Sequence, residues 1–238
     1  MSIRLVTFDL DDTLWDVTPV MHSAEATLRD WLARAAPRLG PVPIEHLWAV
    51  RSRLLAAEPL LKHRLSELRR RILFHALSDA GYAEDEARAL AEQGFQIFLE
   101  ARHRVELFPD VHRTLEQLAN RYTLGVITNG NADVRRLGLA DYFRFALSAE
   151  ELGVGKPDPH PFQTALQRAG VKAAEAVHIG DHPGDDIAGA QASGLRAIWY
   201  NPLDKAWGED PPPDAQVRRL SDLPALLANW ERQPFTRP

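Results

Sequence analysis

The chain has 238 residues, which is enough to bury a large hydrophobic core in one or two domains. Its net charge of −5, from 28 basic and 33 acidic residues, argues against broad nucleic-acid binding, because phosphate contacts need a basic surface. The absence of cysteine excludes disulfides, thiolate metal sites and a cysteine nucleophile, and it fits the cytoplasmic location that we expect for this protein.

The first predicted element is a short buried strand that ends in a cluster of acids. Leu5-Val6-Thr7-Phe8 is apolar and rich in β-branched and aromatic residues, and Asp9, Asp11 and Asp12 follow it. Asp9 and Asp11 lie two residues apart, so extended backbone points them to the same side. Two acids in one small site repel each other unless a cation lies between them. The stretch therefore predicts a metal-dependent acid cluster at the strand's carboxyl end, with a capped helix start as the simpler alternative.

From about residue 16 to residue 102 the pattern becomes helical. Apolar residues recur at helical spacing over four stretches with short connections between them. We expect helices at about Val20–Ala35, Ile44–Ala57, His63–Ala80 and Ala83–Arg102. Four consecutive amphipathic helices predict a small bundle that is inserted into another domain.

From Phe108 onward, strand and helix patterns alternate, which is typical of a parallel sheet with crossover helices. We predict strands at Thr123–Thr128, Phe145–Ser148, Ala176–Ile179 and, as the last one, Arg196–Tyr200. The helices are expected at Val111–Asn120, Pro161–Ala169, Asp186–Ser193 and about 221–230, with a proline-rich loop over 201–214. No apolar run approaches the ~20 residues that span a bilayer, and no signal-peptide pattern is present, so we expect no membrane partner.

The two ends of the chain are expected to form one domain. The strand near residue 5 has no helix of its own sheet directly after it. The simplest account is an α/β protein whose core is a Rossmann-like, doubly wound parallel sheet made of residues 1–15 and 103–238. Residues 16–102 then form an inserted four-helix-bundle cap.

Three further strand ends or loops carry polar residues. Thr128-Asn129-Gly130 offers a hydroxyl, an amide and a glycine, which together suit phosphate oxygens, although Asn-Gly alone is foremost a turn signal. Lys156 lies between Gly155 and Pro157, which fix the backbone around it. Asp181 follows a buried strand, and Asp185 and Asp186 come shortly after it as a second acid cluster.

This combined pattern resembles the haloacid dehalogenase superfamily of phosphohydrolases. A strand-end DxD, a strand-end Thr-Asn, an isolated lysine and a strand-end Gly-Asp with a second Asp occur here in that family's order, and the inserted helices resemble its first class of cap. The likeness covers nearly the whole chain. It implies hydrolysis of a phosphomonoester with Mg²⁺, through an aspartyl-phosphate intermediate.

The resemblance also implies a role for each acid at the strand ends. Asp9 is the expected nucleophile, and Asp11 is the expected general acid that later serves as the base for water. The Asp9 carboxylate, the Asp11 backbone carbonyl and Asp181 are the expected Mg²⁺ ligands, because this ion prefers oxygen. Asp186, rather than Asp185, is expected to orient Lys156 or a metal-bound water.

Thr128, Asn129 and Gly130 are the expected phosphate-binding residues. Lys156 is expected to offset the charge of Asp9 and of the phosphate, as phosphoryl transfer depends mainly on positioning and charge neutralisation.

A closer likeness concerns the substrate. The run Ile127–Ala132, with Gly138-Leu139 and Asp141-Tyr142-Phe143 after it, is similar to bacterial phosphatases acting on flavin mononucleotide. The same group acts on 5-amino-6-(5-phospho-D-ribitylamino)uracil. The likeness implies a small phosphorylated metabolite as the partner and riboflavin metabolism as the setting, while the sequence gives no oligomeric state.

Other functions of the same fold stay open. They are a phosphatase for another substrate, such as a nucleoside monophosphate or phosphoglycolate, a sugar-phosphate mutase, and a catalytically silent binding protein. Two relatives are disfavoured. The family's dehalogenases lack an acid at the position of Asp11, and its phosphonatases place a cap lysine in the site, whereas Trp15–Ser23 contains none.

Overall fold

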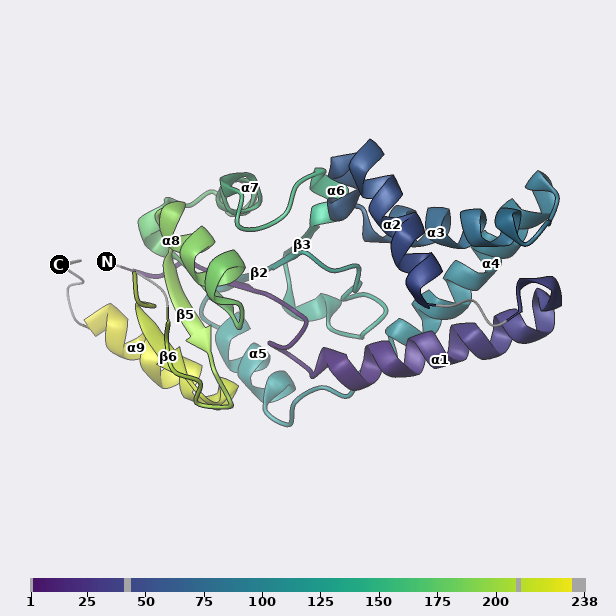
Figure 1. Cartoon of the computed structure of the whole chain (residues 1–238). Helices are drawn as coiled ribbons and strands as arrows, with labels where there is room; N and C mark the ends of the chain where they lie inside the picture. Colours follow the sequence, from purple (N-terminus) through teal and green to yellow (C-terminus); the bar gives the residue numbers. More distant parts are fainter. Residues whose placement is uncertain (1, 41–43, 209–210, 233–238) are drawn as a thin grey trace. The chain divides into compact units, whose positions relative to one another are not determined.

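The structure is a computed structural model that describes residues 2–40, 44–208 and 211–232 (Figure 1). It divides into two compact units, of which the first combines Met1–Asp16 with Glu106–Pro238 and the second is Val17–Val105. The first unit is therefore built from both ends of the chain. Of the predicted proline-rich loop, residues 209 and 210 lie outside the described part.

The first unit contains a six-stranded sheet in the order β3-β2-β1-β4-β5-β6, and each neighbouring pair is parallel. Its strands are β1 (Leu5–Phe8), β2 (Thr123–Thr128), β3 (Phe145–Ser148), β4 (Ala176–Gly180), β5 (Arg196–Tyr200) and β6 (Ala215–Val217). The sheet confirms the predicted α/β, Rossmann-like fold class. Since β1 lies between β2 and β4, the strand order reverses there, and the carboxyl ends of these three strands meet where such sheets bind ligands.

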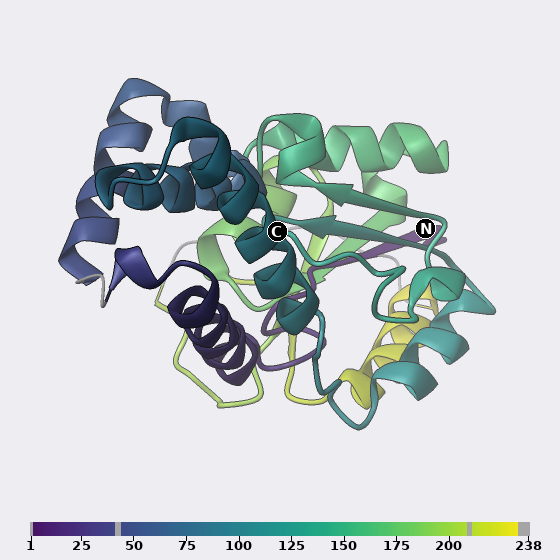
Figure 2. The same ribbon diagram turned by 90° about the vertical axis from the view of Figure 1, so that its right-hand side faces the viewer.

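Helices cover both faces of the sheet, as Figure 2 shows. They are α5 (Val111–Ala119), α6 (Ala149–Leu152), α7 (Pro159–Ala169), α8 (Gly189–Ala192) and α9 (Leu223–Arg232). Helices α7 and α8 pack against each other on one face, while α5 and α9 pack together on the other. The α7 side buries a continuous apolar cluster that includes Leu5, Ile127, Phe162 and Trp199, and burial of this kind is the main stabilisation of the strands.

The second unit is a bundle of four helices. They are α1 (Val17–Ala35), α2 (Ile44–Ala57), α3 (Leu65–Asp79) and α4 (Glu84–Arg102). Helices α1, α3 and α4 share one core, which includes Leu28, Leu77, Phe95 and Phe98. Helix α2 packs on α3 through a separate, smaller cluster around Leu61. That this bundle acts as a cap stays a prediction.

Short turns of 3₁₀ helix connect several elements. They lie at Pro37–Leu39, Pro59–His63, Ala140–Tyr142, Ala173–Glu175 and Leu220–Asp222. No helix in the described part of the chain is both long and apolar enough to cross a membrane.

Two local predictions were wrong, and one short helix was missed. Arg196–Tyr200 is not the last strand, because Ala215–Val217 adds a short edge strand directly after the prolines. The stretch predicted as a helix at Asp186–Ser193 is instead a π-helix at Pro183–Ala188 followed by the single turn α8. The short helix α6 was not predicted; it begins where the Ser148 hydroxyl accepts the Glu151 N–H, which is an N-cap contact.

Candidate active site

The site is built at the carboxyl ends of β1, β2 and β4. Asp9 directly follows β1, Thr128 ends β2, and Asp181 directly follows β4. Asp9 and Thr128 are buried. Asp9 is fixed to the neighbouring strand, since its backbone N–H donates to the Ile179 carbonyl at 2.9 Å. The structure thus brings together the acids that the sequence analysis expected at this edge.

Lys156 lies at the centre of the site. Its Nζ donates to Asp9 Oδ1 and to Asp186 Oδ1, at 2.6 Å in each case, and its side chain is only 1% exposed. Burial alone would lower the pKa of Lys156, but the carboxylates of Asp186 and Asp9 outweigh burial and raise it. The lysine is therefore a fixed positive charge rather than a proton donor.

The Lys156 ammonium donates to two carboxylates, and the pKa values of these carboxylates shift in opposite directions. Burial would raise the pKa of Asp186, but Lys156 and the hydrogen bond from His178 hold it well below the usual range. The pKa of Asp9 is raised well above 3.8, chiefly by burial, because the attraction of Lys156 offsets only part of it and Asp186 and Asp181 add repulsion. Asp9 therefore has the most to gain from further positive charge.

Three carboxylates lie close enough to share a cation. Oxygens of Asp9, Asp181 and Asp186 are all within 4.8 Å of one another. Burial raises the pKa of Asp181 to about 6, and the charges of Asp186 and Asp12 add to the effect. A cluster of buried and half-buried carboxylate oxygens that repel one another matches the ligands preferred by a hard divalent cation such as Mg²⁺. This group of carboxylates differs from the ligand set expected from the sequence, because it includes the Asp186 carboxylate.

Asp181 is held by one contact to its side chain and one to its backbone. The Thr13 hydroxyl donates to Asp181 Oδ1 at 3.4 Å, and the Trp199 indole N–H donates to the Asp181 carbonyl at 2.7 Å. Thr13 comes from the segment after β1 and Trp199 from β5, so two neighbouring parts of the sheet orient this acid.

The lysine loop is clamped by Asn129. The Asn129 side chain donates to the Lys156 carbonyl at 2.9 Å and accepts the Lys156 N–H at 2.8 Å. Gly155 permits this approach, because a Cβ there would lie 2.4 Å from Asn129 Oδ1. The Asn129 amide also donates to Asp185 Oδ2 at 3.1 Å. The Asn129 side chain thus positions the lysine, which the sequence analysis did not anticipate; phosphate binding by this residue stays a prediction.

The other predicted phosphate-binding residues form a tight turn. The Thr128 hydroxyl accepts the Gly130 N–H at 3.0 Å, just beyond the end of β2. This contact orders the turn next to Asp9, since β2 is paired with β1. Contact of Thr128 and Gly130 with phosphate stays a prediction.

Asp11 has a fixed partner that the sequence analysis missed. The indole N–H of Trp15, a fully buried residue, donates to Asp11 Oδ1 at 3.0 Å. The Asp12 N–H also donates to the Trp15 carbonyl and closes a small loop there. The four-residue spacing between Asp11 and Trp15 could have suggested the pair. The contact sets the direction in which the Asp11 carboxylate points.

Asp186 is fixed by the chain around it. Its Oδ2 accepts the His182 N–H at 2.9 Å across the start of the π-helix, a form of helix that is frequent at functional sites. Gly180 leaves room for it, because a Cβ at that position would lie 2.2 Å from Asp186 Cγ. The glycine before Asp181 is thus required by the second acid, and Asp185 points elsewhere, to Asn129.

We predict that Gly180→Ala lowers kcat strongly, because the added methyl must displace the Asp186 carboxylate from Lys156. Overpacking of this kind costs about 1–3 kcal/mol of stability, so the variant should still fold. Steady-state kinetics and thermal unfolding check both effects. Gly208→Ala is the matched control, since its methyl would meet nothing within 4 Å; wild-type kcat in Gly180→Ala would contradict the prediction.

His178, on β4, was also missed as part of the site. It is fully buried, and its Nε2 lies 3.1 Å from Asp186 Oδ1. Burial lowers the pKa of His178, and the opposing attraction of Asp186 does not compensate. A histidine and Thr7 within otherwise apolar buried strands were the sequence signal that could have revealed it.

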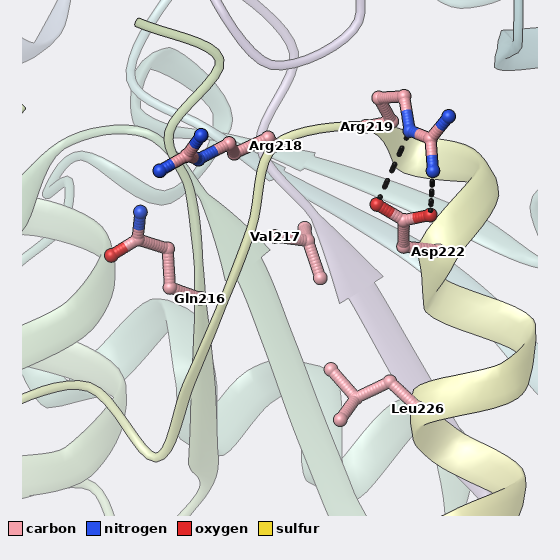
Figure 3. A pocket seen from close by; sticks show the side chains of 6 residues that line it. All are labelled: Gln216, Val217, Arg218, Arg219, Asp222 and Leu226. Carbon is pink, nitrogen blue, oxygen red and sulfur yellow. Dashed lines mark hydrogen bonds and ion pairs between the residues drawn. The ribbon is translucent and has the colours of Figure 1, made fainter. Parts of the chain in front are cut away.

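A separate hollow of about 500 Å³ lies beside β6, the strand at one edge of the sheet (Figure 3). It is lined by Gln216, Val217, Arg218, Arg219, Asp222 and Leu226. Arg219 donates to Asp222, and Arg218 is paired with Asp204, so both guanidinium groups are already engaged. Strands β4 and β5 separate β6 from β1, so this hollow does not belong to the acid cluster.

The fold and the matching family model define this protein as a hydrolase. A model of the haloacid dehalogenase-like hydrolases matches residues 3–194. The chain belongs to this family, which confirms the resemblance found from its motifs.

Individual relatives include enzymes with two different described activities. The 5-amino-6-(5-phospho-D-ribitylamino)uracil phosphatase YigB of Escherichia coli (strain K12) is 35% identical over 229 residues, which cover 94% of this chain and 96% of YigB. A crystal structure described as 2-haloacid dehalogenase, from Pseudomonas syringae pv. Tomato DC3000, is 67% identical, with a TM-score of 0.95 over 96% of this chain and 99% of that one. The magnesium-bound HAD-hydrolase YfnB of Bacillus subtilis is 26% identical, with a TM-score of 0.67 over 95% and 99% of the two chains.

Proposed function

We propose that this protein is a Mg²⁺-dependent phosphomonoesterase that acts through an aspartyl-phosphate on a small phosphorylated metabolite. The observation that carries the proposal is the arrangement of Lys156 Nζ at 2.6 Å from Asp9, with Asp181 and Asp186 beside it. The fixed ammonium attracts the negatively charged substrate, which the carboxylate alone would repel. The buried carboxylate beside it can therefore act as the nucleophile.

In the proposed reaction the Asp9 carboxylate attacks phosphorus, and the bond from phosphorus to the ester oxygen breaks. Asp11 gives its proton to that leaving oxygen. In the second step the Asp11 carboxylate takes a proton from water, which attacks the aspartyl-phosphate and releases inorganic phosphate while freeing Asp9. Lys156 offsets the charge of Asp9 and of the phosphoryl group in both steps.

Asp9 and Asp181 would hold Mg²⁺ through their carboxylates and Asp11 through its backbone carbonyl, with Asp186 near enough to join or to orient a water. When bound, the ion supplies positive charge beside the phosphoryl oxygens. The magnesium reported for YfnB supports this assignment.

A second candidate activity follows from the relative that is 67% identical, which is described as a 2-haloacid dehalogenase. In that reaction Asp9 would attack carbon, and a halide would leave. A halide needs no proton, so Asp11 and the Trp15 contact that directs it would have no role. The presence of this second acid favours attack on phosphorus.

The deciding experiment measures two products from the same enzyme preparation. Phosphate release is followed with p-nitrophenyl phosphate and a panel of phosphorylated metabolites, and halide release is followed with 2-chloropropionate. Mg²⁺-dependent, sustained phosphate release without halide release is the expected result. Halide release alone would overturn the proposal, and a single stoichiometric burst of phosphate transfer would indicate a mutase.

For the natural substrate we propose flavin mononucleotide or 5-amino-6-(5-phospho-D-ribitylamino)uracil, and hence a place in riboflavin metabolism. The similarity to YigB supports this choice. The two compounds belong in the same panel beside phosphoglycolate and a nucleoside monophosphate, and the highest kcat/KM identifies the substrate. The cytoplasmic location stays a prediction.

We predict that EDTA removes the activity and that excess Mg²⁺ restores it. The acids around Asp9 repel one another without a cation, and the attacking carboxylate then faces a negatively charged substrate. Activity is measured before chelation, after it and after Mg²⁺ is added back. Turnover that does not change with EDTA would exclude the metal from the mechanism.

We predict that Trp15→Phe slows substrates with poor leaving groups more than those with good ones. Loss of a hydrogen bond to a charged group costs about 1.5–3 kcal/mol. If the transition state loses that much stabilisation, the kcat of the variant should fall by about tenfold or more. The measurement compares phenyl phosphate with p-nitrophenyl phosphate, whose leaving group needs less protonation. Trp230→Phe, in α9, is the control; an equal loss on both substrates would argue against an effect through Asp11.

A further inference from the structure

The mechanism above does not use His178, a fully buried polar residue of the sheet. It lies on β4 in register with Thr7 on β1, and both side chains are fully buried. Neighbouring residues of a parallel pair share one face of the sheet, and Thr7 and Asp9 share it too, because they lie two apart. His178 is therefore placed below the catalytic edge, on the face that carries Asp9.

Contacts fix the ring on several sides. The Thr7 hydroxyl lies 2.9 Å from His178 Nδ1, and Asp186 Oδ1 lies 3.1 Å from Nε2. The Phe162 ring packs edge-on against the imidazole, with centroids 5.3 Å apart and an interplanar angle of 86°. The ring has little freedom to turn, so its hydrogen bonds have a defined direction.

These contacts select one tautomer. If the proton were on Nδ1, a bare Nε2 lone pair would face the Asp186 carboxylate at 3.1 Å, which is repulsive. With the proton on Nε2, the ring donates to Asp186, and Nδ1 accepts the Thr7 hydroxyl at 2.9 Å. That hydroxyl contact is shorter than its alternative, the Val177 carbonyl at 3.3 Å. Both ring nitrogens are then satisfied.

Asp186 Oδ1 is consequently shared by two donors, His178 Nε2 and Lys156 Nζ. The other oxygen, Oδ2, accepts the His182 N–H. Without the imidazole, only Lys156 and one backbone N–H would hold the carboxylate, and it could rotate about its Cβ–Cγ bond. Rotation would draw the ammonium away from Asp9 Oδ1, which lies 2.6 Å from it.

We propose that His178 is a positioning residue for the reaction. Its Nε2–H holds Asp186 so that Lys156 stays against Asp9, and Thr7 holds the ring in the tautomer that can do so. This role rests on the proposed function, because it acts through the lysine that offsets the charge of Asp9.

The kinetic test compares His178→Leu, which removes the donor, with His178→Gln, whose side-chain amide can donate from near the position of Nε2. We expect His178→Leu to lower kcat on p-nitrophenyl phosphate by about 10- to 100-fold with little change in KM, as is typical for residues that orient others. His178→Gln should recover most of the loss. Unchanged kcat in His178→Leu, or Gln no better than Leu, would overturn the proposal.

Leu118→Ala is the matched control for destabilisation alone. Leu118 is fully buried in α5, on the face of the sheet opposite α7, and is not one of the residues named in the site. It should lower the unfolding temperature while leaving kcat unchanged. A loss of kcat equal to that of His178→Leu would show that instability explains both.

A second measurement does not depend on activity. In protein labelled with ¹⁵N-histidine, the ring signals of His178 are identified in the wild type by their nuclear Overhauser contacts with the Phe162 ring, and their shifts report the tautomer. We expect the Nε2–H form in the wild type; an Nδ1–H form would overturn the proposal even if the variants fail to fold. If the wild type releases no phosphate, the proposed function fails, while the tautomer still tests the hydrogen bond to Asp186.

Discussion

Asp9→Asn is expected to abolish phosphatase activity while the fold survives. Asparagine keeps an Oδ1 that can accept from Lys156 Nζ, so the contact seen at 2.6 Å has a neutral replacement. An amide is a far poorer nucleophile than a carboxylate, and loss of the nucleophile should lower kcat by at least about 10⁴-fold. The measurement is phosphate release with Mg²⁺ present, together with circular dichroism and thermal unfolding.

The matched control for this variant is Asp141→Asn, the same chemical change at an exposed acid of the same unit. Its activity should equal that of the wild type. The unfolding temperature of Asp9→Asn should not fall, because a buried carboxylate with a raised pKa has been replaced by a neutral group. Turnover within tenfold of wild type would show that another group attacks phosphorus.

Lys156→Met is expected to be the most destabilising single substitution in the site. The ammonium lies 2.6 Å from two carboxylates and is almost fully buried. Removing one partner of a buried ion pair leaves an uncompensated charge and costs about 3–5 kcal/mol at neutral pH. Activity should also be lost, since Asp9 and the substrate would then repel each other.

The effect of pH on this variant has a defined sign. In the wild type the pKa of Asp186 is lowered, so its stabilising contribution is present above the unfolded pKa and is lost as pH falls through the folded one. In Lys156→Met only the hydrogen bond from His178 still opposes burial, so we expect the pKa of Asp186 to rise and the variant to lose stability as pH rises. The difference in unfolding free energy should therefore grow from pH 4.5 to pH 7.5.

Urea unfolding at several pH values measures that difference. Lys205→Met is the control, because Lys205 is exposed and the chemical change is the same. A Lys156→Met variant as stable as the wild type at pH 7.5 would mean that Asp9 and Asp186 do not depend on the lysine for their charge.

Much of this fold could be predicted from local sequence, and the reason is visible at β1 and β2. Both are short apolar runs bounded by polar residues, and the structure has them at the predicted residues. The edge strand β6 could not be predicted in this way. It has three residues, follows a proline-rich segment, and is defined by pairing with β5 rather than by its own pattern.

The same division holds for the site. Asp9 and Asp181 could be placed together because the carboxyl ends of parallel strands meet at one edge, whereas Lys156, in a loop, was placed there only by the resemblance to the family. The contacts of Trp15, His178 and the Asn129 clamp could not be derived, because each depends on a side-chain direction that spacing alone does not define. The sequence could only have marked Trp15 and His178 as residues to inspect. The π-helix that carries Asp186 depends likewise on hydrogen bonds to the His182 carbonyl that an α-helical pattern does not indicate.

The assembly of the sheet from both chain ends has a consequence during synthesis. The Asp9 carboxylate leaves the ribosome 147 residues ahead of the Lys156 ammonium that it contacts. At about 5–20 residues per second, this gap lasts roughly 7–30 s. A nascent or prematurely terminated chain that lacks Lys156 therefore holds the proposed nucleophile with no matching charge, so we expect no hydrolysis before Lys156 has been made.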